Sequence, residues 1–384
     1  MRTTVSIGLL GCGTVGGGVA ELLLRERAQI ESRCGIDYQI AGIVVRSAAK
    51  ERPTSIPQRL FTRDAAALID DPNVDLIVEC IGGVDDAREY VERALERGKH
   101  VVTANKELIA TDGPRLSALA ASSRVSLQFE AAVCSAIPIV RTLEESLAGE
   151  DVLDVAGVLN GTSNFILTAM HEGQSYDDAL VDAQRRGFAE ADPRDDVDGV
   201  DAAHKLAILC QLAFHTAITS PRIARTGITK ITPDAIALAS RQGYAIKLLG
   251  FARNSAIGCS AEVAPVFVPL DHPFARTRGA ENCVRVVGRA VGPLTFSGLG
   301  AGRYPGASAI VGDVVAALRS IGTRRRTRSS LAPALAVAPA FNPFQHIQVS
   351  AVRYPVWRDV LDLPHLTKER THDDYPRTSS PIAL

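Results

Sequence analysis

The sequence lacks any long hydrophobic run. No stretch of its 384 residues approaches the ~20 consecutive apolar residues of a membrane-spanning helix. The N-terminal segment MRTTVSIGLL is too short and too polar for a signal peptide. We therefore expect no membrane association and a cytoplasmic location.

Paired cysteines are also lacking. The seven cysteines are scattered, odd in number and never spaced as CxxC, which argues against a disulfide framework and a thiolate zinc site. No metal-ligand spacing of His and Cys is present either. Any hydride chemistry would therefore depend on a protein acid or base rather than on zinc.

Neither sign of charge is in excess. The chain has 42 Lys and Arg against 43 Asp and Glu, a net charge of -1, so nothing draws it to nucleic acid or to an acidic membrane. We expect small molecules and other protein chains as partners, and we interpret the Arg-rich segment 324–328 as a solvated linker. The length predicts two domains and a smaller appendage.

A glycine-rich turn follows the first apolar segment. In TVSIGLLGCGTVGGGVAELLLRE, residues 4–10 predict a strand and those from Val15 a helix, and Gly11, Gly13 and Gly16 form GxGxxG. Glycine permits a tight turn and close approach to a pyrophosphate, which the N–H groups of the helix can bind. The turn predicts a dinucleotide site, with a bare glycine turn as the alternative.

Further apolar segments alternate with helical ones. YQIAGIVVRS, VDLIVECIGG and KHVVTANKELI predict strands, and AREYVERALERG predicts a helix. This alternation is typical of a parallel sheet. We expect an α/β fold, a Rossmann-type doubly wound parallel sheet plus an α+β domain for substrate binding and dimerisation.

The end of the second predicted strand bears on the cofactor. Arg46 and Ser47 stand there, with Lys50 further on, where an NAD enzyme usually has Asp or Glu. A guanidinium suits a 2′-phosphate better than a diol. We expect NADP, with NAD possible; the alternative is that Arg46 is only a surface charge.

Two polar segments lie in the middle of the chain. Lys106 follows a predicted strand, at the edge where ligands of open α/β sheets bind, although a lysine there can simply face solvent. Residues 160–164, NGTSN, open a predicted helix. They suit helix capping, or they suit the carboxylate of a small zwitterion.

The segment 187–205, GFAEADPRDDVDGVDAAHK, contains six carboxylates and leads into the apolar helix LAILCQLAF. Asp201 and Lys205 are four residues apart, so they share a face of that helix. An ion pair entering a buried helix contributes little stability. We therefore predict that Lys205, oriented by Asp201, exchanges a proton with a substrate oxygen; a structural ion pair is the alternative.

The loop before this helix carries further acidic residues. Glu190 and the pair Asp195 and Asp196 could hold a substrate ammonium group, or they could form a solvated acidic loop or a helix cap. His204 points about 100° away from Lys205 on the helix and is interpreted as structural.

Six segments together resemble the homoserine dehydrogenase family, over about residues 1–320: GLLGCGTVGGGV, TANKELIA, VLNGTSNFIL, GFAEADPRDDVDGVDAAHKLAIL, GYAIKLLG and GLGAGRYPGASAIVGD. The resemblance implies that L-aspartate 4-semialdehyde and L-homoserine are interconverted with NADPH or NADH, in the branch leading to threonine and methionine. It also implies a homodimer formed through the sheet of the substrate domain.

The resemblance assigns roles by position. Lys205 would be the acid/base, and Lys106 would lie near both substrate and nicotinamide. The amino-acid pocket would contain Glu190, Asp196, Asp201 and Thr162. The cofactor site would contain Gly11, Gly13, Thr14, Val15, Gly16, Arg46, Thr103, Lys106 and Gly302. A monovalent cation, sodium, would be held largely by backbone carbonyls near Glu130, Val133, Ser135 and Ile137.

The domain boundaries follow from the same comparison. We expect a dinucleotide-binding domain at 1–135, a substrate and dimerisation domain at 136–300, and a return to the first domain at 301–320. Longer family members carry a regulatory ACT domain, whereas residues 321–384 are rich in Pro, Arg, Ser and Thr. We expect an atypical tail or a partial regulatory module, with weak or absent threonine feedback.

The sequence departs from the family pattern at two glycine-rich places. Cys134, Ser135 and Ala136 stand in one, and Arg303, Tyr304 and Gly306 in the other. Two other functions remain open. One is an NADP-linked reductase of another amino-acid semialdehyde. The other is a catalytically silent regulatory paralogue, against which the intact Lys106, Asp201 and Lys205 argue.

Overall fold

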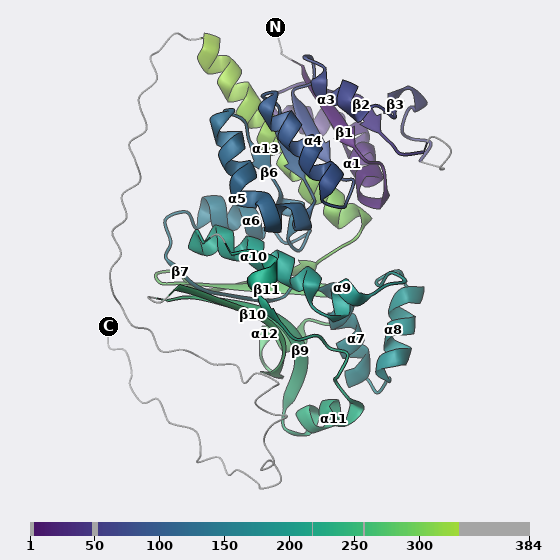
Figure 1. Cartoon of the computed structure of the whole chain (residues 1–384), viewed down its shortest axis with the longest axis vertical. Coiled ribbons are helices and arrows are strands. Elements are labelled where there is room, and N and C mark those ends of the chain that lie inside the picture. Colours follow the sequence, from purple (N-terminus) through teal and green to yellow (C-terminus); the bar gives the residue numbers. More distant parts are fainter. Residues whose placement is uncertain (1–3, 48–52, 217, 256–257, 330–384) are drawn as a thin grey trace.

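The computed structural model describes residues 4–47, 53–216, 218–255 and 258–329. This part of the chain forms two units, each built on a six-stranded sheet. Figure 1 shows the sheets one above the other, with α10 (Val200–Phe214) between them.

The first unit has a parallel sheet in the order β3-β2-β1-β4-β5-β6. The predicted Rossmann-type doubly wound sheet is confirmed. Its strands are β1 (Val5–Leu10), β2 (Tyr38–Val44), β3 (Phe61–Thr62), β4 (Leu76–Glu79), β5 (His100–Thr103) and β6 (Leu127–Gln128). Its helices are α1 (Thr14–Arg25), α2 (Arg27–Cys34), η1 (Gln58–Leu60), α3 (Ala65–Asp70), α4 (Asp85–Glu96) and α5 (Lys106–Ser122). The strand order changes direction between β1 and β4, and ligands of such sheets bind beside that point.

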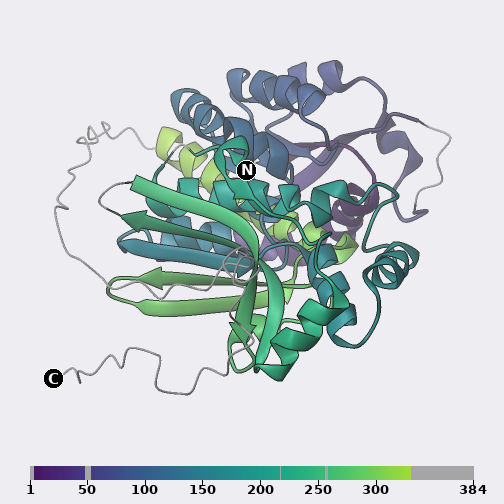
Figure 2. The same ribbon diagram turned by 60° about the horizontal axis from the view of Figure 1, so that its bottom comes forward.

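The second unit has a mixed sheet in the order β12-β11-β7-β9-β10-β8, which Figure 2 shows in front of the first unit. Neighbouring strands are antiparallel except β8, which is parallel to β10. Its strands are β7 (Val152–Val158), β8 (Ala224–Arg225), β9 (Tyr244–Ser255), β10 (Gly258–Pro269), β11 (Glu281–Gly288) and β12 (Gly292–Leu299). The other helices between the units and around this sheet are η2 (Glu130–Ala132), α6 (Ile139–Arg141), η3 (Thr142–Ser146), α7 (Gly161–His171), α8 (Tyr176–Arg185), α9 (Arg194–Val197), η4 (Ser220–Arg222), α11 (Pro233–Arg241) and α12 (Pro273–Arg276).

Helix α10 joins the two units. It contacts α5 of the first unit as well as β7, β9 and β10 of the second. Most of its residues are buried, as the apolar sequence predicts. The residues that flank it at both ends have left-handed backbone conformation, Gly199 (φ 77°) and His215 (φ 51°). The charged start of a buried helix therefore lies where the units meet.

Helix α13 (Arg303–Ser329) returns the chain to the first unit. It contacts α1 and β5, and it lies among the N-terminal elements in Figure 1 although it comes last in the sequence. The close approach to α1 depends on Gly18, where a Cβ would lie 3.1 Å from the Ala307 Cβ. The helix continues past residue 321, where the sequence predicts an atypical tail, and residues 330–384 lie outside the described part. In the described ranges, no helix combines the length and apolar character needed to cross a membrane.

Candidate active site

The glycine turn joins β1 to α1. Gly11 has φ of +99°, and a Cβ there would lie 2.6 Å from a backbone oxygen just after β4. A Cβ on Gly16 would lie 2.4 Å from the Gly11 oxygen. Gly13, the N-cap of α1, instead faces open space, with nothing within 4 Å of its Cβ position. Beside the backbone of Thr14 and Val15, the turn forms a cradle that fits a phosphate group.

The turn from β5 to α5 is held by buried hydrogen bonds. The Thr103 hydroxyl donates to the Glu79 carboxylate and accepts from the Asn105 backbone N–H at 3.0 Å. The Asn105 side chain caps α5 by accepting from the Leu108 N–H at 3.0 Å. Burial raises the pKa of Glu79. This network fixes the start of α5 and hence the position of Lys106, its first residue.

Lys106 and Lys205 meet at the Asp201 carboxylate. Lys106 forms an ion pair with Asp201 Oδ1 from across the boundary between the units. Lys205 Nζ lies 2.8 Å from Asp201 Oδ2 and donates to the Leu159 carbonyl, also at 2.8 Å. The side chains of Asp201, Lys205 and Lys106 are 4%, 10% and 43% exposed. The structure thus brings together all three predicted catalytic residues, and Lys106 is the most open to a ligand.

The charges of this cluster are strongly coupled. Burial opposes ionisation of Asp201, but the neighbouring charges of Lys205 and Lys106 outweigh it and lower the pKa of the carboxyl. The Asp201 charge in turn raises the pKa of Lys106, against the effect of burial. Asp201 is therefore ionised near neutral pH, and Lys106 is protonated.

Asn160 connects this cluster to a second carboxylate. Its Nδ2 donates to Asp201 at 2.9 Å and to Asp196 at 2.6 Å, while its Oδ1 caps α7. Burial raises the pKa of Asp196. Thr162, in the first turn of α7, donates to the Phe188 carbonyl at 2.7 Å. Asn160, the N-cap of α7, thus links Asp196 to the lysine cluster, and Thr162 follows it in the first turn of that helix.

Glu190 and Asp195 are exposed on the same acidic segment. The backbone carbonyl of Glu190 accepts from Gln184 at 3.1 Å. His204 is half-buried on α10, and burial lowers its pKa. These three side chains are not among the partners of Asp201 described above.

The segment predicted to bind a cation follows β6. Cys134 (φ 53°) and Ser135 (φ 32°) both adopt the left-handed region, which favours glycine. The Cys134 carbonyl accepts from the Ile137 N–H at 3.0 Å, and the Glu130 carbonyl accepts from the Val133 N–H at 3.3 Å. The chain therefore turns sharply between the four predicted ligands.

The Glu130 side chain is held by the protein. Its carboxylate accepts from the backbone N–H groups of Val140 (2.8 Å) and Arg141 (3.0 Å), and its own N–H donates to Asp313 of α13 at 2.8 Å. A cation at this segment would therefore meet backbone carbonyls. Among the residues that the structure describes, no three His, Cys, Asp or Glu side chains group as metal ligands.

The other predicted cofactor residues, Arg46 and Gly302, follow β2 and precede α13, respectively. Arg46 follows β2 with its side chain 82% exposed, and its guanidinium lies 4.0 Å from Asp86. Gly302 (φ +125°) precedes α13. A Cβ on Gly306 would lie 3.2 Å from the Val15 side chain, so the first turns of α13 and α1 are in contact.

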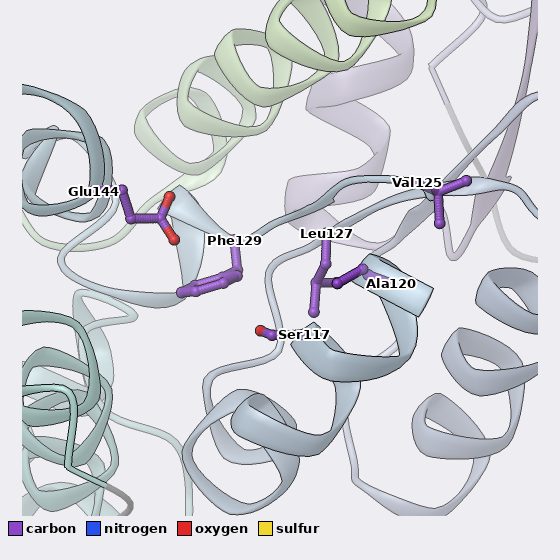
Figure 3. A pocket seen from close by; sticks show the side chains of 7 residues that line it. Ser117, Ala120, Val125, Leu127, Phe129 and Glu144 are labelled. Atoms are coloured by element: carbon purple, nitrogen blue, oxygen red, sulfur yellow. The ribbon is translucent and has the colours of Figure 1, made fainter. Parts of the chain in front are cut away.

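A cavity of about 230 Å³ lies elsewhere in the first unit, between α5 and the segment 125–144 (Figure 3). Glu144 lies at one end of it in the figure. It is lined by Ser117, Ala120, Ala121, Val125, Leu127, Phe129 and Glu144. None of these residues belongs to the lysine cluster, so the cavity does not mark the predicted substrate site.

Comparison with known proteins places this geometry in a family. A model described as homoserine dehydrogenase, NAD binding domain, matches residues 11–130, and one described as homoserine dehydrogenase matches residues 138–315. Homoserine dehydrogenase from Mycobacterium tuberculosis (strain ATCC 25618 / H37Rv) is 43% identical over 368 residues, covering 94% of this chain and 81% of the relative. The chain belongs to the homoserine dehydrogenase family.

Solved structures agree with this membership. A homoserine dehydrogenase from Thiobacillus denitrificans superposes with a TM-score of 0.81 at 42% identity, covering 85% of this chain and 76% of that one. A hyperthermophilic archaeal homoserine dehydrogenase in complex with NADPH has a TM-score of 0.70 at 26% identity, covering 82% and 98%. The chain is thus an oxidoreductase of this family and binds a nicotinamide cofactor, as predicted.

Sequence reasoning missed one residue of the candidate site, Glu79, and one contact of another, Asn160. Glu79 anchors Thr103, and its signal was a carboxylate at the end of the apolar segment VDLIVECIGG. Asn160 was interpreted as a cap or a ligand for a carboxylate, but it also joins Asp196 to Asp201. That link spans more than 35 residues and has no local pattern that could reveal it.

Proposed function

We propose that Lys205 is the acid/base of homoserine dehydrogenase chemistry in this chain, which interconverts L-aspartate 4-semialdehyde and L-homoserine. The observation that carries this assignment is the cluster of Lys106, Asp201 and Lys205 at the boundary between the dinucleotide unit and the second sheet. A small substrate there would contact both units.

The chemistry requires one proton and one hydride. When bound, the reduced nicotinamide supplies the hydride to the aldehyde carbon. The carbonyl electron pair moves onto the oxygen, and the Lys205 ammonium gives that oxygen a proton. Lys205 is left as an amine and regains a proton from water. Its contacts with Asp201 and the Leu159 carbonyl hold Nζ in place for this transfer.

Lys106 and the neighbouring acids serve the amino-acid part of the substrate. Lys106, half-exposed and protonated, is placed to attract the substrate oxygen or carboxylate. Asp196 and Glu190 would hold the ammonium group, with Thr162 beside them at the start of α7. A carboxylate and an ammonium group recognised by opposite charges would fix which end of the substrate faces the nicotinamide.

NADP is the cofactor that we assign. Arg46 stands exposed at the end of β2, where the adenosine ribose lies in such folds, and its contact with Asp86 at 4.0 Å is weak enough to leave it for a 2′-phosphate. Thr103 and Gly302 would border the same cofactor, and NAD would bind more weakly. The archaeal relative solved with NADPH is consistent with this choice.

A monovalent cation, sodium, is assigned to the segment of Glu130, Val133, Ser135 and Ile137. The two successive left-handed residues turn the chain there, and the backbone carbonyls of this segment offer oxygen ligands. Hard cations of this kind take oxygen ligands. The ion would stabilise the segment that connects the two units.

We also propose that the protein is a cytoplasmic homodimer and that its domains have the boundaries predicted above. The register aligns Ala156, Phe251 and Arg285 on one face of the second sheet, and all three are half-buried. The opposite face, with Val155, is buried beneath the helices. A second copy packed on the half-buried face would cover it.

The test is oxidation of NADPH at 340 nm with L-aspartate 4-semialdehyde, with NADH run in parallel. We expect turnover with a preference for NADPH. Lys205→Ala should lose at least about a hundredfold in kcat, the scale of a general acid, while still binding NADPH. A variant with near-native kcat would contradict the role of Lys205, and a preference for NADH would contradict that of Arg46.

A further inference from the structure

Arg303, one of the residues at which the chain departs from its family, lies over the glycine turn. A Cβ on Gly17 would lie 3.6 Å from a guanidinium nitrogen of Arg303 and 3.8 Å from the sulfur of Cys12, which stands within the GxGxxG turn. Gly17 is four residues after the N-cap Gly13. One turn of helix rises 5.4 Å, so the Arg303 charge lies about one turn from the phosphate cradle.

The charge of Arg303 has a protein partner. Nη2 lies 2.8 Å from the Glu21 carboxylate, one turn further along α1. Glu21 also accepts from the Ser55 hydroxyl at 3.2 Å. Arg303 Nε is buried without a hydrogen-bond partner among the described residues. The guanidinium is therefore only partly satisfied, although it sits beside a site for a doubly charged diphosphate.

The packing of α1 keeps this guanidinium in place. At Gly18, a Cβ would lie 3.1 Å from the Arg303 Cγ, so the aliphatic part of the side chain crosses α1 against a glycine. The guanidinium also stacks on the neighbouring Tyr304 ring, 5.8 Å from its centroid. The guanidinium of Arg303 can therefore move along α1 while the aliphatic part of the side chain keeps its packing.

We propose that Arg303 is a cofactor-binding residue that contacts the dinucleotide diphosphate, and that Glu21 competes with the diphosphate for it. The proposal rests on dinucleotide binding at the glycine turn. An arginine fork suits phosphate oxygens, and the helix N-terminus supplies N–H donors from the other side. The Glu21 carboxylate keeps the Arg303 guanidinium near the glycine turn, but it weakens the binding of the diphosphate because both anions compete for the same guanidinium.

The two partners then have opposite effects on affinity. Arg303→Gln should raise the Kd of NADPH, NADH and ADP-ribose alike by about tenfold, since all three carry the diphosphate and a charge-assisted contact is lost. Arg303→Lys should lose less. Glu21→Gln should lower the three Kd values severalfold, because Arg303 is released. A structural ion pair predicts weakening from both substitutions.

The experiment titrates the full chain with each ligand by calorimetry, with NADPH fluorescence as a second readout. Arg25→Gln, which removes an exposed arginine of the same helix paired with Glu26, is the matched control and should stay within about twofold. Melting of each variant reports folding. If Arg303→Gln fails to fold, Glu21→Gln still tests the proposal, because competition predicts a lower Kd and a structural ion pair predicts a higher one.

Three results would overturn the proposal: unchanged affinity of Arg303→Gln, weaker binding by Glu21→Gln, or a loss confined to NADPH, which would assign Arg303 to the 2′-phosphate. Failure of the proposed function looks different. In that case the native chain itself would bind no dinucleotide, or would bind it without turnover of the semialdehyde.

Discussion

At the scale of single residues, the charge balance of the site depends on Asp201. Two lysines from different units share its carboxylate, and its charge raises the pKa of Lys106. Asp201→Asn keeps the shape but leaves two cations facing each other. We expect kcat to fall by at least about a hundredfold, the scale of a positioned acid or base.

The pH dependence of this variant is the sharper readout. Lys106 attracts the substrate oxygen or carboxylate only while it is protonated, so activity falls as pH rises through the pKa of Lys106. Without the Asp201 charge the pKa of Lys106 drops, and this fall should move to lower pH in a kcat profile measured from pH 6 to 10. Asp192→Asn, which removes an exposed acid of the same segment that is paired with Arg194, should leave the profile in place. A native profile in Asp201→Asn would refute the coupling.

The sequence predicted half of this arrangement. The spacing of four between Asp201 and Lys205 gives their shared helix face, because side-chain neighbours within a helix are fixed by its period. The pairing of Asp201 with Lys106 depends on how α10 packs against α5. No local pattern encodes such a contact, so Lys106 could be predicted only as a residue at the ligand-binding edge of the sheet.

At the scale of elements, Lys247 of β9 ties the second sheet to α7. It is buried, and its Nζ donates to the Asn164 side chain at 2.7 Å and to the Thr277 carbonyl at 2.6 Å. Burial lowers its pKa from 10.5 to about 8. The neutral amine keeps both donations. The segment GYAIKLLG reveals a lysine in an apolar strand, but its partners come from distant parts of the chain.

This lysine should make stability depend on pH. Between pH 8 and 10.5 the folded state has released the proton and the unfolded state has not, so stability rises with pH, by at most about 1.4 kcal/mol per pH unit. Lys247→Met removes this dependence and takes a donor from the buried Asn164 Oδ1, whereas the Thr277 carbonyl keeps only the Asn164 amide at 3.3 Å. In urea unfolding, the native chain should be more stable than the variant at pH 7.5, and the difference should widen toward pH 9.5.

The control for this prediction is an exposed lysine of the same unit. Lys230→Met should give a small difference in unfolding free energy that stays constant from pH 7.5 to 9.5. A constant difference for Lys247→Met as well would show that Lys247 titrates alike in both states. The buried amine would then have no part in the pH dependence of stability.

At the scale of the whole molecule, the last described helix completes the first unit. The alternation of strands and helices predicted the parallel sheet, whose order follows from right-handed crossovers. The return of α13 to that sheet was expected from the family resemblance at 301–320, not from a periodic pattern. It buries Ile310, Val314 and Leu318 in the core that contains β1 and α1.

Two truncations separate α13 from the segment beyond it. A chain ending at Gly302 loses these buried side chains at about 2 kcal/mol each, together with the Asp313 contact to Glu130, a large share of the ~10 kcal/mol of a typical domain. We expect it to lose its cooperative melting transition and NADPH binding. A chain ending at Ser329 keeps every residue assigned to the site, so its kcat and its Kd for NADPH should stay within about twofold of the full chain. The measurement is the activity and the thermal melting of both truncated chains beside the full chain. A tenfold loss of activity in the chain ending at Ser329 would contradict this prediction and place a required group within residues 330–384.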